Sequence, residues 1–173
     1  DNINVESISI KKDKWFKDNK ISLLLDKVVS RIDADSKKVI LENTDEIEYT
    51  KLIIATGAEA FVPPFEGKDK EGVFTFRNID DVNAIKKYVK GKKTGAVIGG
   101  GILGLEAAFE LNTLGLAVTV VEIADRILPV QLDKDALNIL EDLINKAGVI
   151  IKKGLGTKEI LGNQNVKGLL LDN

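Results

Sequence analysis

The spacing of apolar residues changes twice between residues 95 and 122, and each change predicts a different element. Residues 96–98 form a short continuous apolar run, which is typical of a buried strand. Apolar side chains then recur at roughly helical spacing from Ile102 to Gly115, where glycine ends the pattern. A second apolar run at residues 117–121 completes a strand, helix, strand unit. This pattern predicts an α/β fold with a parallel sheet.

The first sixty residues alternate short apolar runs with polar turns. Three strand-like runs lie there, at residues 28–32, 37–41 and 51–55. The turn-forming sequences at residues 33–36 and 43–46 separate them. We interpret the region as an antiparallel β-meander that returns to a buried strand.

A short stretch of the first half has a counterpart in the second half. Residues 19–27, which include an apolar strand at 21–25, align with residues 145–153, and each copy follows a predicted helix. Each copy also runs into a hairpin, predicted for the second copy at residues 159–171 around a turn at 162–165. The plan indicates two related nucleotide-binding units in tandem, the first without its glycine-rich opening and the second without its last strand. The alternative is a chance similarity between short apolar strands.

Two further segments have the i, i+3, i+4, i+7 spacing of amphipathic helices, and both stripes predict core packing. The first helix ends near Gly91 and connects to the glycine-rich half of the chain. The second runs from a cap at Asp133 or Asp135 to a stop at Gly148. The stripes are Val82, Ile85, Tyr88 and Val89, and then Ala136, Leu137, Leu140, Leu143, Ile144 and Ala147.

Gly99, Gly101 and Gly104 fit the G-x-G-x-x-G spacing of a dinucleotide-binding turn. The first glycine permits a tight turn, the second lets the backbone approach a pyrophosphate, and the third lets the helix pack close to the sheet. The helix N-terminus offers free N–H groups and partial positive charge to the phosphates. Glu122 ends the next strand, where an acid binds the adenosine ribose of NAD and repels the extra phosphate of NADP. Arg126 lies close enough to weaken the preference for NAD over NADP. The alternative to a dinucleotide-binding turn is an ordinary glycine turn.

The composition narrows the chemistry further. The 173 residues are 44% hydrophobic and 30% charged with a net charge of −2, so nothing in the charge balance favours nucleic-acid binding. Because no apolar run approaches the length of a membrane span and the first residues do not resemble a secretory signal, we expect a cytoplasmic protein. Cysteine, histidine and methionine are absent, so we expect no catalytic side chain and no metal site here. The chemistry would come from a cofactor.

Residues 49–57 read Tyr-Thr-Lys-Leu-Ile-Ile-Ala-Thr-Gly, and a Pro-x-x-x-Gly segment follows at 63–67. They resemble the second flavin motif of the FAD-dependent pyridine nucleotide oxidoreductases, in which such a strand ends beneath the FAD. Residues 74–81 resemble the Arg-x-x-x-Asp element that follows, and residues 122–133 resemble the stretch after the second strand of the NAD domain. The resemblance covers nearly the whole chain and is closest to NADH:rubredoxin oxidoreductases and the flavoprotein part of nitrite reductases.

The resemblance implies cofactor-binding roles for two groups of residues. The glycines and adjacent N–H groups would hold the NAD pyrophosphate, and Glu106 would lie near the nicotinamide, with a solvated charge in the first helical turn as its alternative. Thr56 and Gly57 would meet FAD mainly through backbone, with an ordinary strand-ending turn as the alternative. The NAD group is Gly99, Gly101, Ile102, Leu103, Gly104, Glu106 and Glu122, and the FAD group is Val29, Ala55, Thr56 and Gly57.

We therefore expect a Rossmann-like three-layer dinucleotide-binding unit with a parallel sheet and an antiparallel β-meander, plus the remnant of a second, FAD-binding unit. The expected limits are residues 1–62 for the C-terminal part of an FAD domain, 63–93 for a connector with a helix, and 94–173 for an NAD domain incomplete at its C-terminus. Thr50 and Val130 replace an aspartate and an arginine common in the relatives, which leaves the subfamily open.

The function implied is that of the central segment of an FAD-dependent NADH oxidoreductase, passing hydride from NADH to FAD. Electrons would then reach an acceptor such as rubredoxin, a nitrite-reductase centre or oxygen. The alternative is a non-catalytic NAD-binding module or sensor. A single-domain reductase that acts directly on a small substrate is disfavoured. That class usually needs a proton donor pair beside the nicotinamide, and neither Tyr49 nor Tyr88 lies in such a motif. The lysines between residues 86 and 93 form a solvated face or a docking surface for an acidic redox partner.

Overall fold

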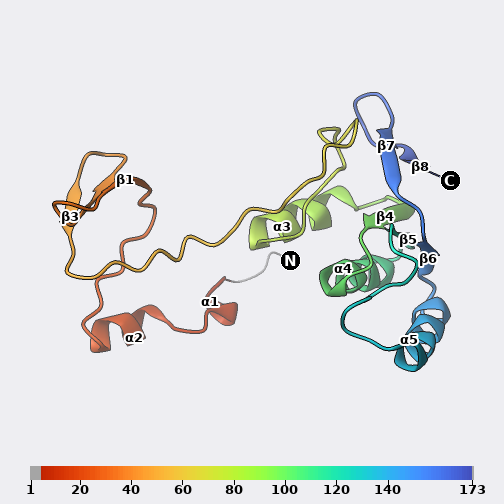
Figure 1. The fold of residues 1–173 in the computed structure, drawn as a ribbon, viewed down its shortest axis with the longest axis horizontal. Coiled ribbons are helices and arrows are strands. Elements are labelled where there is room, and N and C mark those ends of the chain that lie inside the picture. The colour runs from red at the N-terminus through yellow and green to blue at the C-terminus, as the bar shows by residue number, and fades with distance from the viewer. Residues whose placement is uncertain (1–4, 173) are drawn as a thin grey trace. The chain divides into compact units, whose positions relative to one another are not determined.

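The computed structural model describes residues 5–172, and the chain divides into two compact units, Asp1–Ala58 and Glu59–Asn173 (Figure 1). A parallel three-stranded sheet in the second unit and antiparallel sheets in both confirm the α/β class. None of the helices among the described residues combines the length and apolar character that a membrane span needs.

The first unit contains two short helices and an antiparallel sheet with the strand order β1-β2-β3. Oδ1 of Asp33 accepts a hydrogen bond from the N–H of Ser36 (3.0 Å) and so closes the turn between β1 and β2. Val39 and Leu41 on the middle strand are buried. The elements are α1 (Val5–Ile8), α2 (Asp13–Asp18), β1 (Val29–Asp33), β2 (Lys38–Leu41) and β3 (Glu46–Glu48).

Two strand predictions in the first unit are wrong. Residues 21–25 and 51–55 belong to no strand, although the meander between them forms as predicted. Their apolar side chains face solvent, and Ile53 is 88% exposed. A buried strand needs hydrogen-bonding neighbours for its backbone, and the described residues of this unit offer none beside these two runs.

The second unit is built on a parallel sheet with the strand order β4-β5-β6. Helix α4 connects β4 to β5 and helix α5 connects β5 to β6, as parallel pairing requires (Figure 1). The elements are α3 (Ile79–Tyr88), β4 (Thr94–Ile98), α4 (Ile102–Thr113), β5 (Ala117–Glu122), α5 (Lys134–Lys146), β6 (Ile150–Lys153), β7 (Thr157–Leu161) and β8 (Gly168–Leu171).

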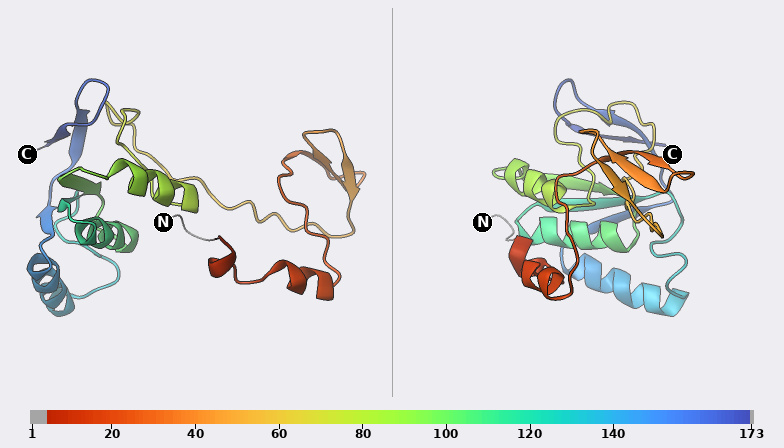
Figure 2. Two further views of the ribbon diagram at one scale, coloured as in Figure 1. Left: turned by 180° about the vertical axis from the view of Figure 1, so that it is seen from behind. Right: turned by 90° about the vertical axis from the view of Figure 1, so that its left-hand side faces the viewer.

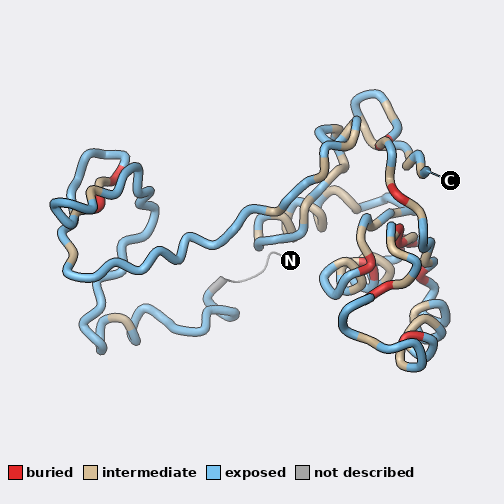
Figure 3. The backbone as a smooth tube through the Cα atoms, viewed as in Figure 1, coloured by how far each residue is buried: buried red, intermediate tan, exposed pale blue. Residues whose placement is uncertain are grey.

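The core of this unit lies between α4 and the parallel sheet, where the buried positions of Figure 3 gather. Its buried residues are Ala108, Leu116, Val118, Val120 and Val149. The central strand β5 supplies two of them, because its neighbours cover both of its edges.

A strand forms at residues 96–98 as predicted, but the prediction that it is buried is wrong. β4 forms there, but Ala96 is exposed and Ile98 is 43% exposed. Exposure alternates along β4, with Gly95 and Val97 partly covered. The reason is that Val97 packs against the core under α4, whereas the side chains of Ala96 and Ile98 point to the other face of the strand.

Both predicted amphipathic helices form. α5 is capped by Asp133, whose side chain accepts a hydrogen bond from the N–H of Ala136, and the chain turns away at Gly148, whose φ is +89°. Leu137 is buried, but Leu143 and Ala147 are exposed, so the core-packing prediction is wrong for these two. α5 packs on the edge strand β6, which is too narrow a surface to cover the whole stripe.

The predicted second hairpin also forms, and a distant segment lies beside it (Figure 2). Ile160 of β7 donates its N–H to the carbonyl of Glu66 (2.9 Å). Further on, Glu71 exchanges backbone hydrogen bonds with Gln164 and Val166 in the hairpin loop. Residues 66–71 are thereby fixed to the hairpin within the second unit.

Candidate dinucleotide-binding site

The glycine turn lies between the end of β4 and the start of α4. Gly99 has a φ of +111°, which side chains rarely adopt, and its N–H donates to the carbonyl of Val121 (2.8 Å). Gly101 is the N-cap residue of α4. The turn therefore stands at the carboxyl edge of the parallel sheet, where open α/β sheets bind ligands.

Gly104 and Gly101 meet different steric conditions. A Cβ on Gly104 would collide with the carbonyl oxygen of Gly99, so the close approach of α4 to the turn requires glycine there. A Cβ on Gly101 would meet nothing within 4 Å, and its φ of −79° suits any residue. The protein's own packing does not require glycine at position 101, whereas close approach of a pyrophosphate would.

The first turn of α4 presents backbone N–H groups without a side-chain cap. The side chains of Asn78 and Asp133 cap α3 and α5, but the N-cap of α4 is Gly101, which has no side-chain acceptor. Ile102 and Leu103 are 53% and 55% exposed. Free N–H groups combined with the helix dipole favour an anion at this end of the helix.

Glu122 at the end of β5 bonds to the glycine turn itself. Its Oε2 accepts a hydrogen bond from the N–H of Gly100 (2.6 Å), and its Oε1 accepts one from the N–H of Ala124 (2.8 Å). Each carboxylate oxygen can still accept a further hydrogen bond, so ribose hydroxyls remain acceptable ligands. Gly100 and Ala124 escape prediction from the sequence, where the only signal for Gly100 is its place in a run of three glycines.

The loop after β5 packs against the same glycine. Ile127 is fully buried, and a Cβ on Gly100 would come within 2.7 Å of its Cγ2. Leu128 has a φ of +45° and donates its N–H to the carbonyl of Gly100 (3.2 Å). Nη2 of Arg126 donates to the carbonyl of Pro129 (2.6 Å), which ties this guanidinium to its own loop.

Glu106 lies on α4, but the part of its alternative that places it in the first helical turn is wrong. The first turn of α4 contains no acidic residue, because the helix begins at Ile102 and Glu106 follows one turn later. The helix dipole acts mainly within the first turn, so it does not account for an acid at this position. The side chain is exposed.

The predicted FAD-binding residues lie in the first unit and are all exposed. Val29 begins β1, whereas Ala55, Thr56 and Gly57 belong to the extended segment after β3. Among the described residues, no backbone hydrogen bond involves residues 50–62. Gly57 has a φ of +76°, and a Cβ there would meet nothing within 4 Å. All four residues are exposed, and their part in binding FAD stays a prediction.

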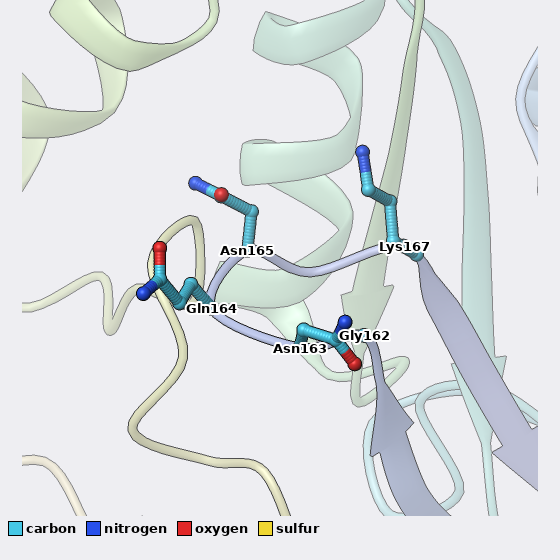
Figure 4. Close-up of a pocket in the computed structure, with 5 residues that line it drawn as sticks. All are labelled: Gly162, Asn163, Gln164, Asn165 and Lys167. Carbon is cyan, nitrogen blue, oxygen red and sulfur yellow. The ribbon is translucent and has the colours of Figure 1, made fainter.

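A shallow hollow in the second unit has no part in the predicted site. Residues of the β7–β8 loop line it, and Figure 4 shows their side chains spreading away from one another. Its lining consists of Gly162, Asn163, Gln164, Asn165 and Lys167. The described part of the chain also contains no group of three carboxylate side chains placed to hold a metal ion.

Comparison with known proteins agrees with the interpretation of the glycine turn as a dinucleotide-binding turn. A sequence model of the pyridine nucleotide-disulphide oxidoreductases matches residues 4–173. The chain belongs to this family. Members of the pyridine nucleotide-disulphide oxidoreductase family depend on FAD and NAD(P)H.

Three relatives illustrate the match. An NADH oxidase from Methanocaldococcus jannaschii is 38% identical, over 90% of this chain and 36% of its own. An NAD(P)H nitrite reductase from Bacillus subtilis is also 38% identical, over 96% of this chain and 21% of its own. The solved ferredoxin reductase from Rhodopseudomonas palustris has a TM-score of 0.90 at 28% identity, over 97% of this chain and 42% of its own. The chain thus spans less than half the length of these relatives.

Proposed function

We propose that the chain is the NADH-binding central segment of an FAD-dependent NADH oxidoreductase. The observation that carries this proposal is the uncapped start of α4 behind Gly101, whose open surface the protein's own packing does not explain. A pyrophosphate at that position would meet unbonded N–H groups, and Glu122 would stand within the same site for the ribose.

The residues of this chain would bind and orient the dinucleotide. The N–H groups of Ile102 and Leu103 would hold the pyrophosphate, Glu122 the adenosine ribose, and Glu106 would lie towards the nicotinamide. In the full-length protein, FAD would supply the hydride acceptor, and no side chain proposed here acts as acid or base. The domain limits at residues 62 and 93 and the three-layer arrangement belong to the same proposal.

The choice of NADH over NADPH follows from charge. The carboxylate of Glu122 would repel a phosphate on the ribose, and Arg126 is bonded to Pro129 in its own loop. Titration of the chain with NADH and with NADPH, followed by nucleotide fluorescence, tests this choice. We expect at least about tenfold tighter binding of NADH, which corresponds to about 1.4 kcal/mol. Equal affinities would show that Glu122 does not discriminate.

A non-catalytic NAD-binding module is the second candidate, since the FAD group of residues is exposed and its residues 55–57 make no backbone hydrogen bond with any described residue. The two candidates differ in turnover. With FAD added, the oxidoreductase predicts NADH-dependent reduction of ferricyanide, whereas the module predicts NADH binding without turnover. A redox protein as the electron acceptor, such as rubredoxin, is part of the first proposal only.

A further inference from the structure

Both backbone groups of Gly100 are bound by the end of β5 and the loop that follows it. Its N–H donates to Glu122 and its carbonyl accepts from Leu128. We propose that Glu122 is a positioning residue that holds the glycine turn in its binding conformation, a role that rests on the proposed NAD site but is separate from contact with the ribose.

The two hydrogen bonds of the Glu122 carboxylate are the best candidate for holding the turn, and we call them the brace. The carboxylate spans two amides, Gly100 at 2.6 Å and Ala124 at 2.8 Å, and both bonds are partly buried. Hydrogen bonds to an ionised acceptor are about twice as strong as neutral ones. The neutral bond from Leu128 to Gly100 is longer, at 3.2 Å. Glu122 therefore joins the turn and the loop more firmly than the bond from Leu128 does.

The packing around Gly100 requires that the brace stay in place. The residue is buried, and a Cβ on it would approach Ile127 Cγ2 to 2.7 Å and Glu122 Cβ to 3.2 Å. The turn and the loop are thus fitted to each other at this point. If the turn moved away from β5, Gly101 and the first N–H groups of α4 would move with it.

The variant Glu122→Gln tests whether the two hydrogen bonds of the carboxylate, and not only a side chain of this size, hold the turn. Glutamine has the same shape but only one acceptor oxygen, and its NH₂ group donates. One of the two amides, Gly100 or Ala124, would then face a donor. The matched control is Glu110→Gln on the exposed surface of α4, which changes the same charge away from the turn.

Amide hydrogen exchange in the free chain tests the brace without a ligand. In the wild type we expect the Gly100 amide to exchange at least about tenfold more slowly than the unbonded amide of Ile102. Glu122→Gln should bring the exchange of either Gly100 or Ala124 up to that of Ile102, whereas Glu110→Gln should leave both amides slow. Equal exchange at the two amides in the wild type would overturn the proposal, whether or not the variant folds.

Nucleotide binding separates positioning from ribose contact. The probe is an NADH analogue whose adenosine ribose lacks the 2′ and 3′ hydroxyl groups. A brace predicts that Glu122→Gln weakens the analogue as well as NADH, by about tenfold for the analogue. A residue that acts only on the ribose would weaken NADH and leave the analogue unchanged, which would overturn the proposal. If the wild type bound neither compound while Gly100 stayed protected, the proposed NAD site would fail and the structural brace would stand.

Discussion

The glycines of the turn meet different physical conditions. Gly99 meets a conformational constraint, its φ of +111°. Gly104 meets a steric one, since its Cβ would strike the carbonyl of Gly99. Gly101 meets neither, which is why the ligand is the best reason for glycine there. Substitutions at these positions should therefore affect stability and binding separately.

Gly104→Ala should destabilise the chain. The added methyl group meets backbone that cannot move without shifting α4, and overpacking of this kind costs about 1–3 kcal/mol. Urea denaturation measures the loss. The control is Gly101→Ala, which should leave stability unchanged or raise it by up to about 1 kcal/mol, because its φ suits alanine. Equal stability of the two variants would contradict the steric assignment.

The pKa of Asp33 depends on its hydrogen bonds with Ser36. Hydrogen bonds from the Ser36 hydroxyl and then from its backbone N–H hold the pKa of Asp33 below its ordinary value. Since the folded pKa is lower than the unfolded one, the resulting stability is present above the unfolded pKa and lost as pH falls through the folded pKa. Ser36→Ala should raise the pKa of Asp33 in a carboxyl NMR titration. An unchanged titration curve would rule out the hydroxyl as the main cause.

Sequence reasoning reaches some of these residues and misses others for a physical reason. Gly99 and Gly104 are predictable because their backbone geometry excludes other residues. The bonds from Glu122 to Gly100 and Ala124 are not, since any residue carries an N–H and the sequence does not show which amide a carboxylate will meet. The burial of Ile127 cannot be predicted from the sequence either, because it depends on how the loop after β5 folds.

At the scale of elements, local signals decide where helices begin and end. Asn78 and Asp133 both cap their helices, and α3 has a complete capping box with Asp81. These signals act between residues close in sequence, so they can be predicted. The runs at 21–25 and 51–55 show the opposite case, because strands need partners that local sequence does not provide.

The cap of α5 gives a prediction at this scale. Asp133→Ala removes the acceptor for the N–H of Ala136 and should cost about 1 kcal/mol of stability. Asp135→Ala removes an acid from the same first turn without removing a cap, so its cost should be only a few tenths, about 0.3 kcal/mol. Thermal unfolding of both variants provides the comparison. Equal losses would mean that charge near the helix dipole, and not the cap, stabilises α5.

At the scale of the whole molecule, the two units differ in what they offer a cofactor. The second unit contains the glycine turn, the uncapped helix and the bridging acid in one place. In the first unit Val29 and residues 55–57 are exposed, and no backbone hydrogen bond among the described residues involves residues 55–57. The chain also spans only 36% of the related NADH oxidase. A firm flavin site is therefore not expected from these residues by themselves.

The purified chain should carry no bound flavin. After expression and gel filtration, we expect no flavin absorbance with the protein, even when FAD has been added beforehand. The longer NADH oxidase relative, treated in the same way, is the control. A flavin spectrum that stays with the 173-residue chain would contradict this prediction.

If the turn at Gly99 to Gly104 binds the pyrophosphate of NADH, a titration of the wild type and of Gly101→Ala with NADH will show it. We expect the wild type to bind NADH saturably and the variant, with unchanged stability, to bind at least about tenfold more weakly. Equal NADH affinity of the two proteins, or no binding by a folded wild type, would contradict it.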